Sequence, residues 1–184
     1  MIHILGISGS LRRGSFNTAA LRAAASLAPD DVKVDAFTLH GIPMFDPDGE
    51  ARDGRTRAVL EFRTAIREAD GLLIATPEYN YSITGALKNA IDWASRGGTD
   101  SPLNGKPAAI LGAGGRFGTL RSQLHLREIL LHNRVDVIPG PQVMIELASE
   151  RFDAEGRLIS ERHAGQIRRL MEALRDRVLR SAVS

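Results

Sequence analysis

Short apolar segments alternate with amphipathic ones along the whole chain, and this alternation limits the possible fold more than any other feature. Apolar or β-branched runs of strand length occur at residues 2–8, 32–38, 71–76 and 106–112, with weaker ones at 135–138 and 143–145. Helical spacing of apolar residues occurs between them, at residues 18–27, 56–69, 84–95, 120–132 and 161–180. Strands that are apolar on both faces, such as "GLLIATP", are typical of a parallel sheet with helices on each side. We therefore expect an α/β fold with a doubly wound, five-stranded parallel sheet.

Length and composition favour one soluble domain over residues 1–184. The chain has 184 residues without a repeat or linker, and 43% of them are hydrophobic and 25% charged, which is typical of a globular protein. No apolar run reaches the ~18 residues that a transmembrane helix needs, and no secretion signal opens the chain, so we expect a cytoplasmic protein. A formal net charge of +2 favours neither nucleic acid nor a membrane as a partner.

The residues that usually bind metals are sparse. Cysteine is absent, which excludes disulfides, thiolate nucleophiles and cysteine-based metal sites. His125 and His132 can share a helix face, but no third ligand lies near them in the sequence. The acidic segment "DPDGEARDG" lacks the late glutamate of a calcium loop. We assign no metal to this chain.

The turn "GSLRRGSFN", at residues 9–17, has the composition of an anion site. Its glycines permit close approach of the backbone, and the helix that follows supplies N–H groups and the positive end of a dipole. It is neither a nucleotide P-loop, which ends in Gly-Lys-Ser/Thr, nor the G-x-G-x-x-G of dinucleotide folds. Five side chains remain that suit a terminal phosphate: Ser10, Ser15, Asn17 and Thr18 beside Arg12. Helix capping by Ser15 or Asn17 is the simpler alternative.

A second turn, "PEYNYSITG", follows the third expected strand and contains both tyrosines of the chain. Carboxyl ends of parallel strands share one edge of a sheet, so this turn should lie beside the first. It places Pro77, Glu78, Tyr79 and Asn80 where backbone N–H groups can bond a flat heterocycle. Packing of the aromatic rings against a neighbouring helix or subunit is the alternative.

A third turn, "GAGGRFG", follows the fourth expected strand and is dense in glycine. It does not match the dinucleotide motif, because Phe117 stands where the third glycine would be. We expect Gly112, Gly114 and Gly115 to line the far side of the same crevice, with their backbone close to a ligand. Together the three turns predict one site with a phosphate at one end and a planar ring at the other, which fits a mononucleotide cofactor better than a dinucleotide.

The pair "GSLRRGSFN" and "TPEYNYSITGALKNAIDW" closely resembles the NAD(P)H-dependent FMN reductase family, over about residues 2–140. That family includes quinone, chromate and azo-dye reductases. The resemblance implies a flavodoxin-like three-layer sandwich that binds FMN and uses NADPH or NADH.

The resemblance also implies residue roles. The FMN phosphate would be held by Ser10, Arg12, Ser15, Asn17 and Thr18, and the isoalloxazine would lie along Pro77, Glu78, Tyr79 and Asn80. Gly112 to Gly115 fall where members contact the pyrimidine side; some members carry serines there, so only backbone contacts carry over. Members form homodimers or homotetramers with the flavin near a subunit boundary, which makes Tyr81, Trp93 and the helix from Leu120 interface candidates.

The implied activity is hydride transfer from NAD(P)H through FMN to a quinone, chromate, an azo compound or free flavin, in a ping-pong cycle. The flavin would carry the chemistry, and we expect no catalytic acid, base or nucleophile. Two alternatives stay open: a flavodoxin-type electron carrier, disfavoured by the slightly basic charge, and a non-enzymatic regulator or binding module without turnover. The segment 43–53 is either a flap that shapes the acceptor pocket or a surface excursion.

Overall fold

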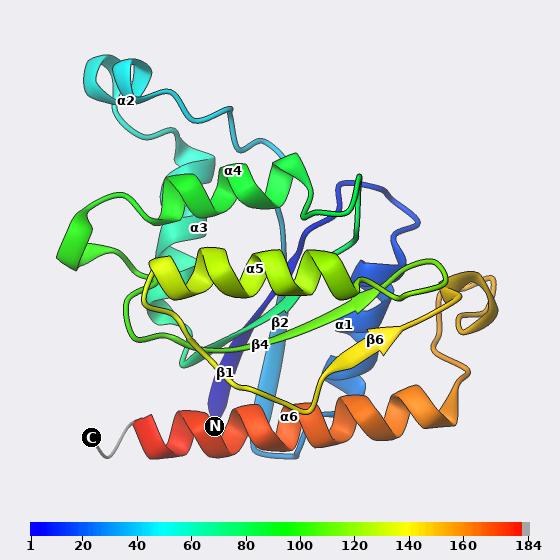
Figure 1. The fold of residues 1–184 in the computed structure, drawn as a ribbon. Coiled ribbons are helices and arrows are strands. Elements are labelled where there is room, and N and C mark those ends of the chain that lie inside the picture. Colours follow the sequence, from blue (N-terminus) through cyan, green and yellow to red (C-terminus); the bar gives the residue numbers. More distant parts are fainter. Residues whose placement is uncertain (182–184) are drawn as a thin grey trace.

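The computed structural model describes residues 1–181 and contains a parallel sheet in the strand order β2-β1-β3-β4-β5 (Figure 1). Its first four positions are β2 (Val32–Thr38), β1 (Ile2–Ser8), β3 (Gly71–Ala75) and β4 (Pro107–Ala113). β3 and β4 are buried along their whole length, as their continuous apolar runs predicted. The doubly wound sheet expected from the β-α alternation is confirmed.

Two short strands fill the fifth position of the sheet. β5 (Asp136–Val137) pairs with the start of β4, and β6 (Val143–Ile145) pairs with its end, both in parallel. The Ile138 amide still donates to Ala108 of β4, and residues 139–142 leave the sheet before β6 begins. The two weak strand signals in the sequence are therefore two parts of one edge.

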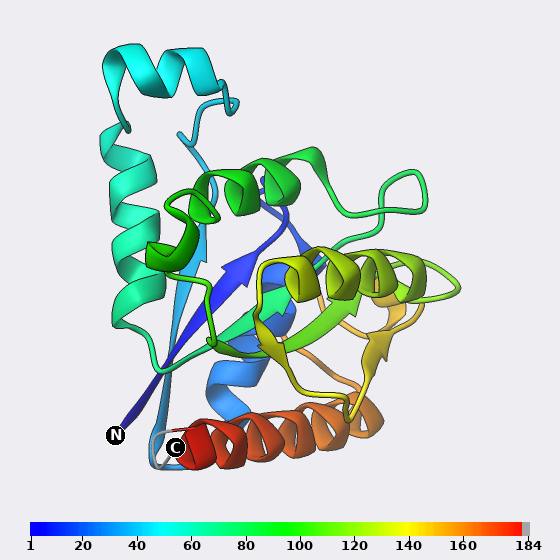
Figure 2. The ribbon, with the colours of Figure 1, turned by 60° about the vertical axis from the view of Figure 1, so that its left-hand side comes forward.

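Helices cover both faces of the sheet (Figures 1 and 2). One face carries α1 (Phe16–Leu27) and α6 (Glu161–Ser181), and the other carries α3 (Arg57–Glu68), α4 (Gly85–Ala94) and α5 (Leu120–His132). The core accordingly divides into two buried clusters, one on each side of the sheet. No helix within residues 1–181 combines the length and the apolar character needed to cross a membrane.

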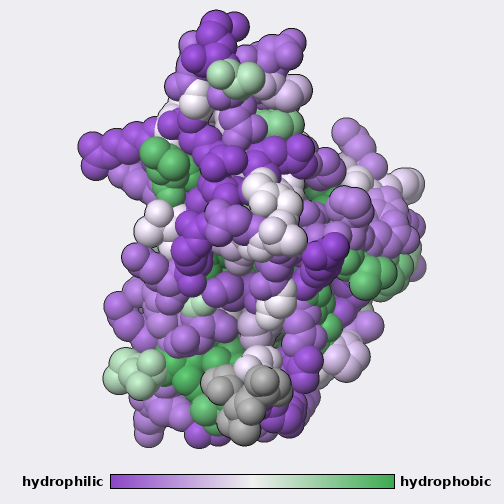
Figure 3. Space-filling view, turned by 90° about the vertical axis from the view of Figure 1, so that its left-hand side faces the viewer, coloured by the Kyte–Doolittle hydropathy of each residue, from purple (hydrophilic) through white to green (hydrophobic). Residues whose placement is uncertain are grey.

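A helix that the apolar pattern does not predict, α2 (Pro47–Asp53), projects from the body (Figures 1 and 2). Asp46 caps its start and Pro47 stands in its first turn, and both are favourable at those positions. All seven of its residues are partly or fully exposed, so it lacks the apolar stripe that periodicity detects. Figure 3 shows this projection, at the top of the view, as mainly hydrophilic.

The base of the α2 projection is tied to α4. Trp93 Nε1 and Asn89 Nδ2 each donate to the carbonyl oxygen of Pro43 at 2.8 Å, and the Phe45 ring meets Trp93 edge-on at 4.9 Å. Trp93 is only 3% exposed, because segment 43–45 covers it. The suggestion that Trp93 contributes to a subunit interface is therefore wrong, since its ring already packs within its own chain.

Gly112 lies where β4 packs against the start of α5. A Cβ at this position would overlap Thr119 Oγ1 and lie 2.6 Å from the carbonyl oxygen of Thr76. Glycine is needed here because Thr119 and Thr76 occupy the space that a side chain would fill.

Replacing Gly112 by alanine should lower the free energy of unfolding by about 1–3 kcal/mol, because the added methyl group overpacks a buried contact. Urea denaturation measures the change. Gly85→Ala is the matched control, since a Cβ there would meet nothing within 4 Å, and it should leave stability unchanged or slightly raised. A midpoint for G112A equal to that of the parent protein would contradict the packing described.

Candidate functional site

The three turns meet at the carboxyl edge of the sheet around one cavity of ≈ 330 Å³. Nine of the twelve candidate residues line it: Ser10, Arg12, Ser15, Asn17, Pro77, Glu78, Tyr79, Gly114 and Gly115. Thr18, Asn80 and Gly112 lie outside this lining. The segment 43–53 also lies outside it, so the idea of a flap over this site finds no support in the cavity wall.

The first turn leaves several donors unused. Ser15 caps α1 by accepting from the Thr18 amide at 3.3 Å, so the simple capping alternative applies to this residue. The amides of Phe16 and Asn17, in the first turn of α1, donate to no other described residue. The guanidinium of Arg12 likewise forms no ion pair within residues 1–181. Unused N–H groups, a helix N-terminus and a free cation make this end of the cavity suited to an anion.

Two candidates in this turn bind other parts of the protein. Thr18 Oγ1 lies 2.8 Å from Ser8 Oγ, which turns it away from the cavity. Asn17 Nδ2 donates to the carbonyl oxygen of Ala113 at 2.9 Å, and the Ala113 amide donates back to Asn17 Oδ1 at 2.9 Å. This buried pair joins the start of α1 to the end of β4. The second N–H of the Asn17 side-chain amide is left for a ligand.

The second turn is a tight hairpin. Tyr79 and Ser82 exchange two backbone hydrogen bonds of 3.0 Å, and Asn80 and Tyr81 at its tip have φ values of 51° and 65°. Positive φ at both central residues is typical of a type I′ turn. Asn80 therefore stands at the exposed tip, and the Tyr79 amide is already used. The Glu78 amide donates to no other group in the described chain, so it is the free backbone donor among the residues of this turn that line the cavity.

The carboxylate of Glu78 caps α5. Its Oε2 accepts from the amides of Arg121 at 2.9 Å and Ser122 at 3.2 Å, and its Oε1 lies 3.3 Å from Arg121 Nη1. Thr119, at the N-cap position, makes no capping side-chain bond in the part of the chain that the structure describes. A residue forty-odd positions away thus supplies the negative charge that a helix start favours.

The glycines of the third turn differ in what they face. As at Gly112, a Cβ on Gly114 would overlap protein, here the carbonyl oxygen of Gly118, so Gly114 is small for packing as well as lining the cavity. The Gly114 amide donates to Ile145 at 3.0 Å. A Cβ on Gly115 would meet no described atom within 4 Å, and its amide has no acceptor in residues 1–181. Gly115 is thus the residue of this turn that both lines the cavity and has a free backbone donor for a ligand.

The sequence reasoning missed a fourth part of the wall. Leu147, Ala148 and Ser149 line the cavity directly after β6. The Leu147 amide donates to Gly115 at 3.0 Å and the Ala148 amide to Gly114 at 2.9 Å, which pairs this segment with the glycine turn. The weak strand signal at 143–145 was the available clue, because the residues after any parallel strand emerge at the same edge.

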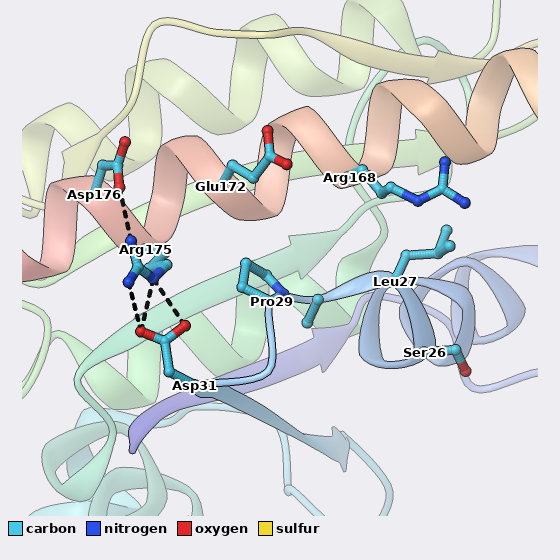
Figure 4. A pocket seen from close by; sticks show the side chains of 9 residues that line it. Ser26, Leu27, Pro29, Asp31, Arg168, Glu172, Arg175 and Asp176 are labelled. Atoms are coloured by element: carbon cyan, nitrogen blue, oxygen red, sulfur yellow. Dashed lines mark hydrogen bonds and ion pairs between the residues drawn. The ribbon is translucent and has the colours of Figure 1, made fainter.

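Larger grooves lie elsewhere, two of them about twice the volume of this cavity. One of ≈ 680 Å³ runs between residues 26–31 and α6, where Arg175 pairs with Asp31 at 2.7 Å and also reaches Asp176 (Figure 4). The other, of ≈ 690 Å³, lies between the last turns of α4 and α5. Both are lined by residues from outside the three turns. Converging unused donors, rather than volume, identify the smaller cavity as the candidate site.

Comparison with known proteins gives a consistent result. The model of a family described as NADPH-dependent FMN reductase matches residues 2–150. An NAD(P)H-dependent FMN reductase of Pseudomonas aeruginosa is 51% identical over 174 residues, which cover 94% of this chain and 93% of that protein. A quinone reductase of Escherichia coli K12 is 40% identical over 156 residues, covering 84% and 82%. The solved structure of FerB, a flavoenzyme NAD(P)H:(acceptor) oxidoreductase from Paracoccus denitrificans, has a TM-score of 0.88 at 29% identity and covers 98% of this chain and 99% of FerB.

Glu78→Ala should lower the free energy of unfolding of the ligand-free protein by about 0.5–2 kcal/mol, because α5 loses its cap. Glu128→Ala, an exposed change in the same helix, is the control and should stay within about 0.5 kcal/mol of the parent protein. Urea denaturation followed by circular dichroism measures both. Equal stability of the two variants would mean that Glu78 does not hold the start of α5.

Proposed function

This chain belongs to the NADPH-dependent FMN reductase family, and we propose that its FMN lies in the cavity where the turns after β1, β3, β4 and β6 meet. It is an oxidoreductase that uses NAD(P)H. One observation above all supports this location. The unused donors beside Arg12 share a cavity with the backbone amides of Glu78 and Gly115, which come from two other turns and also lack an acceptor in the described chain.

The phosphate of FMN fits the first turn. The free amides of Phe16 and Asn17 start a helix, where the dipole favours negative charge, and Ser10 and Ser15 add hydroxyl groups. Arg12 would add a charge-assisted hydrogen bond, and no described carboxylate competes for it. These groups hold an anion without attacking it, because the turn contains no nucleophile with an adjacent base.

The ring fits the opposite end. The free amides of Glu78 and Gly115 come from different turns and are suited to bond the edge of a planar heterocycle. Fixed N–H dipoles of this kind stabilise negative charge that develops on a bound group, since they need no reorganisation. Tyr79, which is half exposed, lines the same cavity.

Bound FMN would supply the redox chemistry, by accepting a hydride from NAD(P)H and passing the electrons to an acceptor. We infer that quinones are the principal acceptors, in keeping with the quinone reductase relative; chromate, azo compounds and free flavin are further acceptors of the same proposal. Donor and acceptor would use the same opening in turn, so ping-pong kinetics are expected. The electron-carrier alternative gains no support, because the relatives are named as reductases.

A homo-oligomer is part of the proposal, with α5 and the hairpin at its interface. Tyr81 and Phe117 are 66% and 58% exposed, and the Arg121 guanidinium contacts both rings, at 4.1 Å and 5.3 Å from their centroids. Leu124 and Leu131 add exposed apolar surface on the same helix. Exposed aromatic and arginine side chains in one cluster are typical of interface centres.

The direct test is anaerobic titration of the FMN-loaded protein with NADPH, with NADH titrated in parallel. The yellow absorption should bleach, and adding a benzoquinone should restore it without any second protein. Steady-state rates at several quinone concentrations should give the parallel double-reciprocal lines of a ping-pong cycle. A protein that needs a separate reductase to turn over would be an electron carrier instead.

Arg12→Ala should weaken FMN binding by about 1.5–3 kcal/mol, roughly ten- to a hundredfold in Kd, because a charge-assisted phosphate contact is lost. Quenching of flavin fluorescence on titration measures the Kd. Arg13→Ala, which removes a neighbouring exposed charge outside the cavity lining, is the control and should change it little. The same Kd in both variants would exclude Arg12 from the phosphate site.

A further inference from the structure

His163, near the start of α6, is buried and makes hydrogen bonds through both ring nitrogens. Nδ1 lies 2.7 Å from Ser160 Oγ, and Nε2 lies 3.0 Å from Glu146 Oε2. A carboxylate only accepts, so Nε2 carries a proton and donates it to this bond. The Ser160 hydroxyl can donate to Nδ1 or accept from it, so both ring nitrogens of His163 have a hydrogen-bond partner.

Glu146 receives two donors from α6. Arg162 Nη1 donates to its Oε1 at 2.8 Å, beside the bond from His163 to Oε2. Burial alone would raise the pKa of Glu146, but its own backbone N–H, His163 and Arg162 together hold that pKa below the ordinary value. The carboxylate is therefore charged near neutral pH and engages both of its oxygens with one helix.

Glu146 also lies between β6 and the cavity wall. The residue before it, Ile145, accepts from the Gly114 amide, and the residue after it, Leu147, donates to Gly115. Leu147 has a φ of 49°, a conformation that costs free energy for a branched residue and persists only where its surroundings enforce it. The only charged side chain in this stretch thus sits at the point where the backbone turns into the cavity.

We propose that His163 and Glu146 are positioning residues for the cofactor cavity. By fixing the start of segment 147–149 to α6, they hold the glycine turn in the arrangement that leaves the Gly115 amide free. This inference rests on the proposed FMN site and adds to it two residues that line no part of the cavity.

The remaining attachments of α6 explain why the effect should be local. Ile167, Leu170 and Leu174 are fully buried and anchor the helix to the sheet without this pair. At the far end of the helix, Arg175 pairs with Asp31, which precedes β2 (Figure 4). Loss of the bond to Glu146 therefore should free the 147–149 turn rather than detach the helix.

Glu146→Ala removes the acceptor and is the principal variant; Glu146→Gln keeps an acceptor oxygen and removes the charge. We expect an FMN Kd about tenfold higher in E146A, as for loss of a charge-assisted bond, and a smaller increase in E146Q. In the FMN-free protein, hydrogen exchange at the amides of Leu147 and Ala148 should be faster in both. Asp31→Ala, which breaks the matched ion pair at the other end of α6, should leave the Kd and this exchange unchanged.

An FMN Kd and an exchange rate in E146A equal to those of the parent protein would overturn the inference, as would an equal change in D31A. If E146A does not fold, E146Q is compared with the parent protein in the same way. An FMN Kd and an exchange rate in E146Q equal to those of the parent would then overturn the inference. Failure of the parent protein to bind FMN would overturn the proposed function instead. The exchange measurement needs no flavin, so faster exchange in E146A would still support the positioning role.

Discussion

The turns at the carboxyl edge of the sheet are held by one another's polar groups, and the cavity depends on this. Asn17 bonds Ala113 in both directions, Glu78 caps α5, and Thr84 Oγ1 donates to the carbonyl oxygen of Gly9 at 2.6 Å. A buried polar group without a partner costs roughly 1–3 kcal/mol. Once the turns are buried together, these hydrogen bonds therefore favour this one arrangement of the turns over others. The few donors that they leave over define where a ligand can bind.

The layers of the fold were predictable because burial decides them locally. Each strand in the middle of the sheet is apolar on both faces and each covering helix on one, so the spacing of apolar residues carries the information. The fifth strand was harder, since its two parts contain two and three residues and are defined by pairing with β4. The exposed helix α2 has no apolar spacing and depends on its Asp46 cap instead.

The site was predictable in its place and less so in its detail. The residue types in the turns after the strands indicated most of the cavity wall. The type of a residue does not show which group it bonds, however. The sequence does not reveal that the side chain of Asn17 also bonds Ala113, 96 positions away, through its oxygen and one of its N–H groups. Trp93 reads as a candidate for contact with another subunit until Pro43 is found over it. Such long-range contacts leave no periodic signal, and residues 147–149 were missed because the strand before them is so short.

The divided fifth strand has a consequence for how copies of this chain can associate. A sheet edge recruits a foreign strand when it presents an unbroken row of unpaired amide and carbonyl groups. At this edge the row is interrupted by residues 139–142, between two strands too short to serve as a template. The edge is thereby protected against edge-to-edge aggregation, and a stable contact on this side has to be built from side chains.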